Sequence, residues 1–372
     1  MDKKKILIIS RAFYPQNSPR SFRTTELVKE FCKQGHEVTL LTALQKDFDY
    51  TPFLKEHPIR LESMGEMKWK PFGKSKFFGD WPRKLDRFLH LFFEYPNIEL
   101  LFKLKKIVPR YKGFDLLVSV AVPHSIHWGV AAVRTKKNPI AKVWVADCGD
   151  PFMGNTLESI PAPFYFSYFE KKFCRKADFI SIPTSGAVEA YYPEFRSKIV
   201  VIPQGFDFSA VSITRTVASN EIITFAYAGG VASSGIRSPK KLIEFLLKSN
   251  TPFQFHFYSN NYGLLTEFAN QAPDAIFLHP PLPRKELLNE LATMDFLVNL
   301  DNGTKNQTPS KLIDYALVGK PILNIPAENF DKAVVTSFLN RDYSQQLIVE
   351  DIERFNIINV AHQFLSLRNE SV

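Results

Sequence analysis

The feature that most constrains the fold is a repeated alternation of short apolar runs with segments of helical character. In the first half the apolar runs are 5–10, 36–42, 115–120, 141–146, 178–182 and 199–202. In the second half they are 222–228, 253–258, 275–278, 296–300 and 322–325. Short apolar runs separated by helices are typical of parallel strands that are buried on both faces. The sequence therefore predicts an α/β protein with two parallel sheets.

Chain length and local composition predict two domains. A chain of 372 residues is longer than a single hydrophobic core usually serves. The segment 208–220 is rich in Ser, Thr and Val without a clear period, so we expect a linker there. We predict an N-terminal Rossmann-like domain over 1–205 and a second domain over 206–349. An amphipathic helix is expected within 350–372, packed back on the first domain.

A basic, aromatic region at 65–110 carries part of the net charge of +9. Within it, 68–84 interleaves cations with large aromatic residues, and 87–93 continues the pattern. This composition favours a surface that contacts anionic lipid headgroups. The alternative is an insertion whose aromatic rings fold back onto the core. Nucleic acid is not an expected partner, because no motif that reads bases accompanies the charge.

Other sequence features exclude several classes. No apolar run approaches the roughly 18 residues that a membrane-spanning helix needs, so we expect a cytoplasmic protein. Cys32, Cys148 and Cys174 are odd in number and lack metal-ligand spacing, which favours reduced, structural thiols. No Gly-x-Gly-x-x-Gly follows a first strand and no Walker-type loop occurs, which argues against nicotinamide enzymes and P-loop kinases.

The segment 308–325 combines a helix start, a cation and a carboxylate. Thr308 can cap a helix and Pro309 suits its first position. Ser310 and Lys311 then lie where backbone amides face an anion. Asp314 follows Ser310 by four residues on the same helix face, where it can accept hydrogen bonds from sugar hydroxyls. This pattern predicts a site for a nucleoside diphosphate.

The loop 228–241 provides a second set of phosphate-binding groups. Gly229 and Gly230 permit close approach of the backbone to a phosphate. Arg237 and Lys240, with Lys311, are expected to supply positive charge to a bound diphosphate. The alternative for these cations is a solvated position at a helix start.

In the first half, polar residues follow three of the predicted strands. Ser18, Arg20 and Arg23 open the first helix and suit an anionic ligand such as a phosphate. The alternative is a capped helix with exposed arginines.

After two later strands come two histidines and two carboxylates. Their positions suit groups that orient a substrate hydroxyl or accept its proton. Each can equally be a hydrogen-bonded polar anchor. They are His124, His127, Asp147 and Asp150.

Residues 309–321 resemble the donor-binding signature of GT-B glycosyltransferases, particularly family 4, which reads Pro-Ser-Lys-x-x-Glu-Tyr-x-x-x-Gly-Lys-Pro. Residues 122–127 and 144–152 resemble two motifs of a bacterial branch, Pro-Pro-His-Ser-x-His and Trp-x-Ala-Asp-Phe-Arg-Asp-Pro-Trp. Residues 199–207 are similar to Val-Ile-Pro-Asn-Gly-x-Asp, which lies where the family's chain crosses between domains. The blocks occur in the family's order over nearly the whole chain.

The sequence also departs from the family pattern. Asp314 replaces the signature Glu, and Gly230 and Gly149 stand where the family has Arg. Near Asn306 the expected upstream acid is missing. These departures leave open a catalytically silent GT-B scaffold that binds a nucleotide or a partner enzyme. A GT-B sugar-nucleotide epimerase is a second alternative.

The resemblance implies two facing Rossmann-like domains, the first on the acceptor side and the second binding a nucleoside-diphosphate sugar. It implies retaining transfer to a hydroxyl without a metal or another cofactor. Together with the basic region it implies a glycan or lipid-linked acceptor at the inner membrane face, as in bacterial surface polysaccharide synthesis. The predicted catalytic residues are His124, His127 and Asp150; donor binding is predicted for Gly229, Gly230, Arg237, Lys240, Thr308, Pro309, Ser310, Lys311 and Asp314; and the acceptor or phosphate side for Ser18, Arg20, Arg23 and Asp147.

Overall fold

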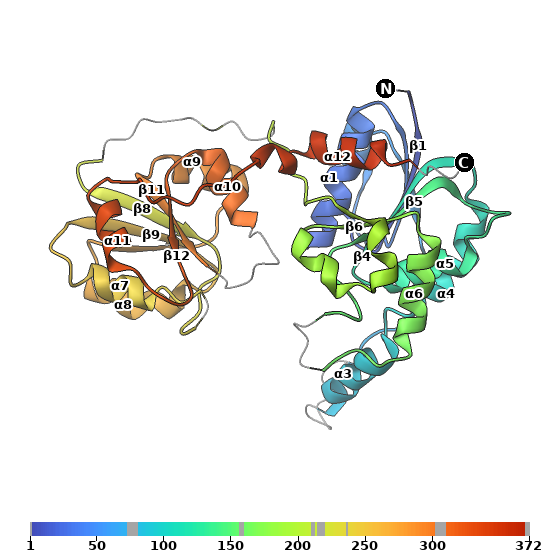
Figure 1. Ribbon diagram of the computed structural model, residues 1–372, viewed down its shortest axis with the longest axis horizontal. Coiled ribbons are helices and arrows are strands. Elements are labelled where there is room, and N and C mark those ends of the chain that lie inside the picture. Colours follow the sequence, from blue (N-terminus) through green and yellow to red (C-terminus); the bar gives the residue numbers. More distant parts are fainter. Residues whose placement is uncertain are drawn as a thin grey trace. The chain divides into compact units, whose positions relative to one another are not determined.

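The chain forms two compact units, each with its own sheet (Figure 1). The computed structural model describes residues 2–72, 81–155, 160–209, 213, 220–235, 237–301 and 310–368. Unit 1 comprises Met1–Asp207 and Arg354–Val372, and unit 2 comprises Phe208–Glu353. Thr308, Pro309 and Asn306, which the sequence singles out, lie outside the described residues.

Unit 1 contains a seven-stranded sheet in the order β3-β2-β1-β4-β5-β6-β7, and every neighbouring pair is parallel. Its strands are β1 (Lys5–Ser10), β2 (Glu37–Thr42), β3 (Arg60–Ser63), β4 (Phe114–Ala121), β5 (Ala141–Cys148), β6 (Phe179–Ile182) and β7 (Ile199–Val201). Its helices are α1 (Pro19–Lys33), α2 (Thr51–Glu56), α3 (Trp81–Phe93), α4 (Glu99–Ile107), α5 (Ser125–Val133), α6 (Phe166–Lys176) and α12 (Ile357–Ser366).

Both faces of this sheet are covered, which explains why its strands are apolar without alternation. Ile6 and Ile8 of β1 belong to a core with α1 and α12. Leu7 and Ile9 belong to the opposite core, with α4, α5 and α6 (Figure 1). Each residue of such a strand loses its contact with water, so periodicity of two is absent.

The C-terminal segment belongs to unit 1. Phe206 donates its amide hydrogen to the carbonyl of Phe355 at 2.8 Å, and Ile357 donates to Phe206 at 2.9 Å. Asn356 caps α12, which then packs against α1. The chain thus re-enters unit 1 beside the point where it leaves.

Unit 2 contains a five-stranded sheet in the order β10-β9-β8-β11-β12, again parallel throughout. Its strands are β8 (Ile223–Ala228), β9 (Phe253–Tyr258), β10 (Ile276–His279), β11 (Phe296–Leu300) and β12 (Ile322–Ile325). Its helices are α7 (Lys240–Leu246), α8 (Thr266–Gln271), α9 (Arg284–Ala292), α10 (Ser310–Val318) and α11 (Lys332–Leu339).

The prediction of two parallel α/β sheets is confirmed, and each predicted strand matches an observed one within two residues at either end. Two elements were missed in the stretch between β2 and the aromatic region, namely α2 and β3. β3 is an edge strand with the sequence Arg-Leu-Glu-Ser and no fully buried residue. An edge strand of this kind lacks the apolar run on which the prediction depended.

Both sheets change direction at one internal pair of strands. In unit 1 the chain proceeds outward from β1 on one side and from β4 on the other. In unit 2 the corresponding pair is β8 and β11. Ligands of open parallel sheets bind beyond the carboxyl ends of such a pair. Among the described residues, no helix is long and apolar enough to cross a membrane.

Candidate functional site

In unit 2, the carboxyl ends of β8 and β11 carry a lysine, an aromatic ring and a glycine loop in direct contact. Lys311, from the first turn of α10, places its Nζ 3.3 Å from the carbonyl oxygen of Leu300 at the end of β11. The same Nζ lies 4.5 Å from the centre of the Tyr227 ring in β8. The Tyr227 hydroxyl donates to the carbonyl of Gly230 at 2.7 Å. These contacts join three elements into one cluster, which we call the Lys311 cluster.

The surroundings of Lys311 in this cluster disfavour the charged form of its side chain. The pKa of Lys311 is lowered to about 7, chiefly by burial and also by the charge of Arg237, against the opposing effect of Asp301. Desolvation and a neighbouring cation both disfavour the ammonium form. An anion bound at this point would relieve both effects, so the cluster suits an anionic ligand.

In the glycine loop of this cluster, Gly229 has a backbone conformation in which any other residue would be strained. Gly229 has φ of +144°, and a Cβ there would lie 3.1 Å from the Tyr227 hydroxyl oxygen. A Cβ at Gly230 would meet nothing within 4 Å. Gly229 is half-buried and Gly230 exposed, Tyr227 connects this backbone to Lys311, and Arg237 from the same loop is exposed to solvent.

Helix α10 is fixed to the end of β8 by a buried tyrosine. The Tyr315 hydroxyl accepts a hydrogen bond from the amide of Ala228 at 2.8 Å, and burial raises the pKa of this tyrosine. This bond connects the helix to the residue that precedes the glycine loop. Of Ser310, at the start of α10, the structure describes only the backbone.

Asp314 has a partner that the sequence did not predict. Its Oδ1 accepts hydrogen bonds from Nε and Nη2 of Arg284, at 2.9 and 2.7 Å. Burial raises the pKa of Asp314, while the Arg284 guanidinium opposes the shift. Binding of sugar hydroxyls by Asp314 stays a prediction, with Arg284 of α9 as a residue that would orient the carboxylate.

Lys240 does not join the Lys311 cluster through any contact that the structure describes. It lies exposed at the start of α7 and pairs with Glu244 of the same helix at 3.8 Å. Exposed pairs of this kind contribute little to binding or stability. The structure therefore favours the alternative stated above, a solvated lysine.

In unit 1, two residues predicted for the acceptor or phosphate side instead form a buried ion pair. Arg23 of α1 donates from Nε and Nη2 to the two carboxylate oxygens of Asp147, at 3.1 and 2.8 Å. Arg23 also donates to the carbonyls of Ile202 and Pro203, and Ser181 donates to Asp147 at 2.7 Å. Both members of the pair are almost fully buried. They connect α1 with β5, β6 and the end of β7, so the prediction of ligand contact is corrected to a structural role.

The charges of this pair compensate each other. Burial raises the pKa of Asp147, but the charge and hydrogen bonds of Arg23, with smaller effects of Arg20 and Ser181, outweigh burial and hold the pKa below its usual value. The guanidinium of Arg23 also lies over the Phe364 ring of α12, at 5.1 Å from its centre. The same arginine thus contacts the returning C-terminal helix.

Arg20 occupies the space above Gly149, where the resembled motif has an arginine. A Cβ built on Gly149 would lie only 2.1 Å from Cζ of Arg20. A guanidinium therefore lies at the carboxyl end of β5, although residue 149 has no side chain. No local sequence signal reveals this, because Arg20 belongs to α1. Ser18 caps that helix by accepting from the amide of Ser21 at 3.2 Å.

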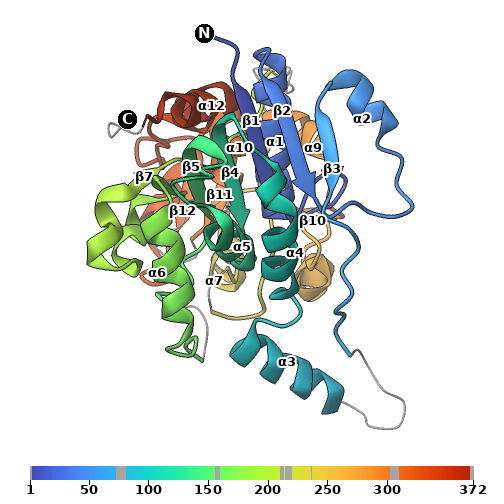
Figure 2. The same ribbon diagram turned by 90° about the vertical axis from the view of Figure 1, so that its right-hand side faces the viewer.

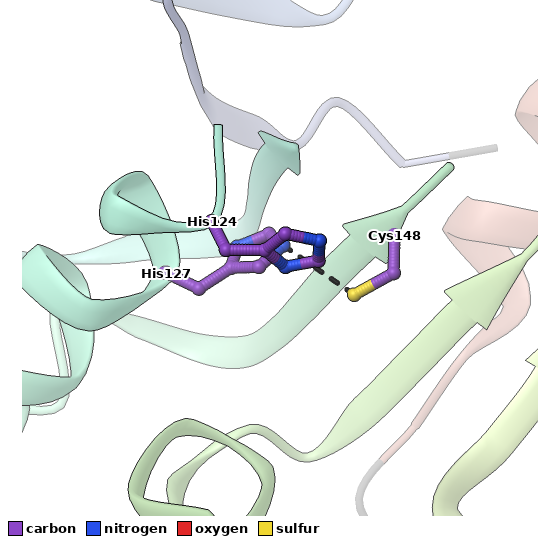
Figure 3. A group of neighbouring side chains, drawn as sticks. All are labelled: His124, His127 and Cys148. Atoms are coloured by element: carbon purple, nitrogen blue, oxygen red, sulfur yellow. Dashed lines mark hydrogen bonds between the residues drawn. The ribbon is translucent and has the colours of Figure 1, made fainter. Parts of the chain in front are cut away.

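The two histidines predicted to be catalytic lie inside the protein (Figure 3). The Nδ1 atom of His127 is 2.8 Å from the Ser119 hydroxyl, and its Nε2 is 3.4 Å from the Cys148 sulfur. Burial lowers the pKa of His124 to about 4 and that of His127 to about 3. Both side chains are buried, so solvent does not reach either ring in this conformation. The contacts of His127 match the hydrogen-bonded anchor stated above, whereas Nδ1 of His124 is buried without a hydrogen-bond partner. A catalytic role for either histidine stays a prediction.

His124, His127 and Cys148 also form the one group of at least three metal-ligating side chains found among the described residues. Their ligand atoms lie within 4.8 Å of one another. Imidazole and thiolate are zinc ligands, but a closed structural site uses four of them. Burial raises the pKa of the Cys148 thiol, and a thiol–imidazole hydrogen bond accounts for its contact with His127. The hydrogen bond explains the pairing of His127 with Cys148, and the absence of a metal stays a prediction.

Asp150, the third residue predicted to be catalytic, differs from the two histidines. It follows β5 and is partly exposed. Asp150 thus keeps the access to solvent that a group acting on an acceptor needs. Its catalytic role stays a prediction.

Comparison with known proteins identifies the fold. No family model and no curated protein matches the sequence. Among solved structures, the apo form of the lipopolysaccharide outer core galactosyltransferase WaaB matches with a TM-score of 0.58 and 14% identity, covering 97% of this chain and 98% of that one. Anabaena HepE, solved with UDP and glucose, matches with a TM-score of 0.57 and 12% identity, covering 97% and 98%. The protein has the GT-B fold.

The GT-B fold is shared by enzymes of more than one reaction type. UDP-GlcNAc 2-epimerase from Neisseria meningitidis, bound to UDP-GlcNAc, matches this GT-B chain with a TM-score of 0.57 and 11% identity, covering 97% and 98%. Likeness at this level of identity concerns the backbone. The reaction must therefore be argued from the residues of the site.

Proposed function

We propose that this GT-B protein transfers a sugar from a nucleoside-diphosphate sugar to a hydroxyl acceptor. The observation that carries the proposal is the Lys311 cluster at the carboxyl ends of β8 and β11. There a partly desolvated ammonium group lies beside exposed glycine backbone and a second cation, Arg237. A departing nucleoside diphosphate needs positive charge at this step, and the cluster supplies it.

Each part of the Lys311 cluster has a role in this reaction. Lys311 donates to an oxygen of the leaving diphosphate, while the Gly229–Gly230 backbone approaches the phosphates closely. Arg237 adds charge from the same loop. Because protein cations neutralise the leaving group, we propose that no metal is required. We propose retention of configuration, with attack from the side of the departing phosphate.

The acceptor side is proposed from unit 1. Asp150, partly exposed after β5, is the group offered for contact with the acceptor hydroxyl, and Arg20 provides a cation beside it. We propose a glycan or lipid-linked acceptor in bacterial surface polysaccharide synthesis, with a cytoplasmic protein peripheral to the inner membrane. The similarity to a lipopolysaccharide galactosyltransferase supports this class of acceptor.

Nucleotide-dependent thermal stabilisation tests the donor site. The protein is heated with uridine, guanosine and other nucleoside diphosphates, and we expect one of them to raise the melting temperature. A ligand at about 100 times its Kd stabilises by about 2.7 kcal/mol. Lys311→Met should abolish the shift and Lys240→Met should retain it, since Lys240 lies outside the cluster. If no diphosphate stabilises the protein, the proposal is wrong.

Two other functions give different results in turnover assays. A sugar-nucleotide epimerase converts the nucleotide-sugar into its epimer when no acceptor is present, and releases free nucleotide only where water takes up the sugar; the structural similarity to UDP-GlcNAc 2-epimerase makes this worth testing. A silent scaffold binds a nucleotide tightly and neither transfers nor hydrolyses any donor. Transfer that depends on an added acceptor distinguishes the proposed function from both.

A further inference from the structure

Helix α3 exposes large aromatic side chains to solvent. Trp81, Phe88 and Phe93 are 63%, 47% and 55% exposed, and Phe92 is exposed as well. Pro82 is the one buried residue of this helix, all of which the structure describes. Figures 1 and 2 both show α3 projecting from the end of unit 1, away from its sheet. Soluble proteins rarely leave such a cluster uncovered unless it has a partner.

The exposed residues of α3 are arranged as in a helix that lies at a lipid interface. Trp81, Leu85, Phe88 and Phe92 follow one another at intervals of four, three and four residues, so they share one face. The Phe88 and Phe92 rings are in contact, with centroids 4.7 Å apart. Cations lie on the rest of the helix: Arg83, Lys84 and Arg87. An aromatic face beside a cationic face is typical of helices that lie in the headgroup region.

A second segment, distant in sequence, extends this aromatic surface. Phe164 and Tyr168 are 84% and 61% exposed. Tyr165 donates a hydrogen bond from its hydroxyl to the carbonyl of Phe92 and thereby fixes this segment to α3. The start of α6 thus adds rings that the sequence did not connect with the basic region.

The segment before α3 carries two aromatic rings that stack on Tyr95 and two lysines that are exposed. Trp69 and Phe72 stack on Tyr95, with centroids 5.9 and 6.0 Å apart, yet both stay exposed, at 40% and 58%, and neither joins the core. Lys68 and Lys70 remain exposed beside these rings.

Two acidic residues near this segment, Glu99 and Asp86, accept hydrogen bonds from backbone amides. Glu99 accepts from the amides of Lys68 and Trp69, at 2.9 and 2.7 Å. Asp86 accepts from the amide of Phe72 at 3.0 Å. Glu99 and Asp86 therefore hold the segment before α3, and Glu99 also pairs with Lys103 at 3.5 Å, while Lys68, Lys70, Lys84 and Arg87 are exposed.

We propose that α3 and residues 164–168 form a docking surface for an anionic lipid bilayer. The rings would enter the boundary between headgroups and acyl chains, and the cations would contact lipid phosphates. Charge complementarity selects this occupant, because a purely apolar partner would leave the exposed cations Lys84 and Arg87 without counter-charges. The inference rests on the proposed function only for its purpose, which is to hold the enzyme beside a lipid-linked acceptor.

Vesicle flotation tests the docking surface in the full-length protein. We expect the protein to float with vesicles of phosphatidylcholine and phosphatidylglycerol and to remain behind with pure phosphatidylcholine. Phe88→Ser with Phe92→Ser should reduce the bound fraction at least about tenfold, because two anchoring rings are lost. Lys84→Ala with Arg87→Ala should also weaken binding and make it less sensitive to salt.

Matched controls separate the docking surface from general effects of charge and apolarity. Lys136→Ala with Lys137→Ala removes the same charge from another exposed site of unit 1 and should leave flotation unchanged. Tyr262→Ser with Leu264→Ser removes two exposed apolar residues of unit 2 and should do the same. Equal flotation of the Phe88/Phe92 variant and the parent protein would overturn the proposal. So would flotation that ignores anionic lipid, or ring-dependent self-association without vesicle binding.

Donor binding distinguishes failure of this inference from failure of the proposed function. The thermal shift with a nucleoside diphosphate should be the same in the α3 variants and the parent protein, which also reports that they fold. A shift without vesicle binding refutes only the docking surface. Vesicle binding without any nucleotide shift refutes only the proposed function.

Discussion

The Arg23–Asp147 pair of unit 1 and the Lys311 cluster of unit 2 look alike in the sequence but differ in the structure. Both lie near the carboxyl ends of parallel strands and both were predicted to contact substrate. Arg23 is paired with both oxygens of a buried carboxylate. Lys311 donates to a carbonyl, lies over a ring and is close to a second cation. The charge of Arg23 has its partner within the protein, whereas for Lys311, whose pKa is depressed, we propose that an anionic ligand supplies the partner.

The largest effect is expected from breaking the buried pair. Asp147→Ala leaves Arg23 buried without its counter-charge, which should lower the free energy of unfolding by about 3–5 kcal/mol. Urea denaturation measures this. Asp115→Ala is the control, because Asp115 pairs with an exposed Lys142 and should cost at most about 1 kcal/mol. An equal loss of unfolding free energy in the two variants would show that the buried Arg23–Asp147 pair matters no more to stability than an exposed pair.

Lowering the pH should remove the contribution of the Arg23–Asp147 pair to the free energy of unfolding. The folded-state pKa of Asp147 lies below its ordinary value, so its contribution to stability is present above that value, about 3.9. This contribution is lost as the pH falls through the lower folded-state pKa. Unfolding free energy measured from pH 7 down to pH 3 should therefore decline less steeply at its acid end in Asp147→Asn than in the parent protein.

Nucleotide affinity should depend on pH through Lys311. Its pKa of about 7 means that the free protein loses this charge as the pH rises, and an anion must then pay for its reprotonation. Affinity for a nucleoside diphosphate should fall by up to about tenfold per pH unit above pH 7. Calorimetric titration at several pH values measures it. Lys311→Arg stays charged, so it should remove most of this dependence; an unchanged slope would assign it to another group.

The smallest effect concerns the space shared by Arg20 and Gly149. Gly149→Ala must displace the guanidinium of Arg20, which is the flexible end of a side chain, so the cost should be about 1 kcal/mol or less. In an Arg20→Ala background the same substitution should cost nothing, because the conflict is gone. A double-mutant cycle from denaturation curves measures this coupling. Independent, additive effects would show that the two residues do not share this space.

Local sequence predicted the strands well because burial on both faces leaves an apolar run that is visible without any partner. The runs 253–258, 296–300 and 322–325 correspond to β9, β11 and β12 without error. The helix start predicted from Thr308 and Pro309 agrees with α10, which begins at Ser310. β3 was not predicted, because this edge strand has no run of buried apolar residues.

The sequence by itself determined two parallel sheets, the glycine loop after β8 and the lysine in the first turn of α10, because each depends on neighbours within a few residues. Tertiary structure alone decided which charges are satisfied. Arg23 meets a carboxylate 124 residues away, Asp314 meets Arg284, and Arg20 fills the space above Gly149. These pairings follow from the order of strands in the sheets and the packing of helices on them. Local periodicity reports that a residue is buried, but only the assembled sheet decides what it is buried against.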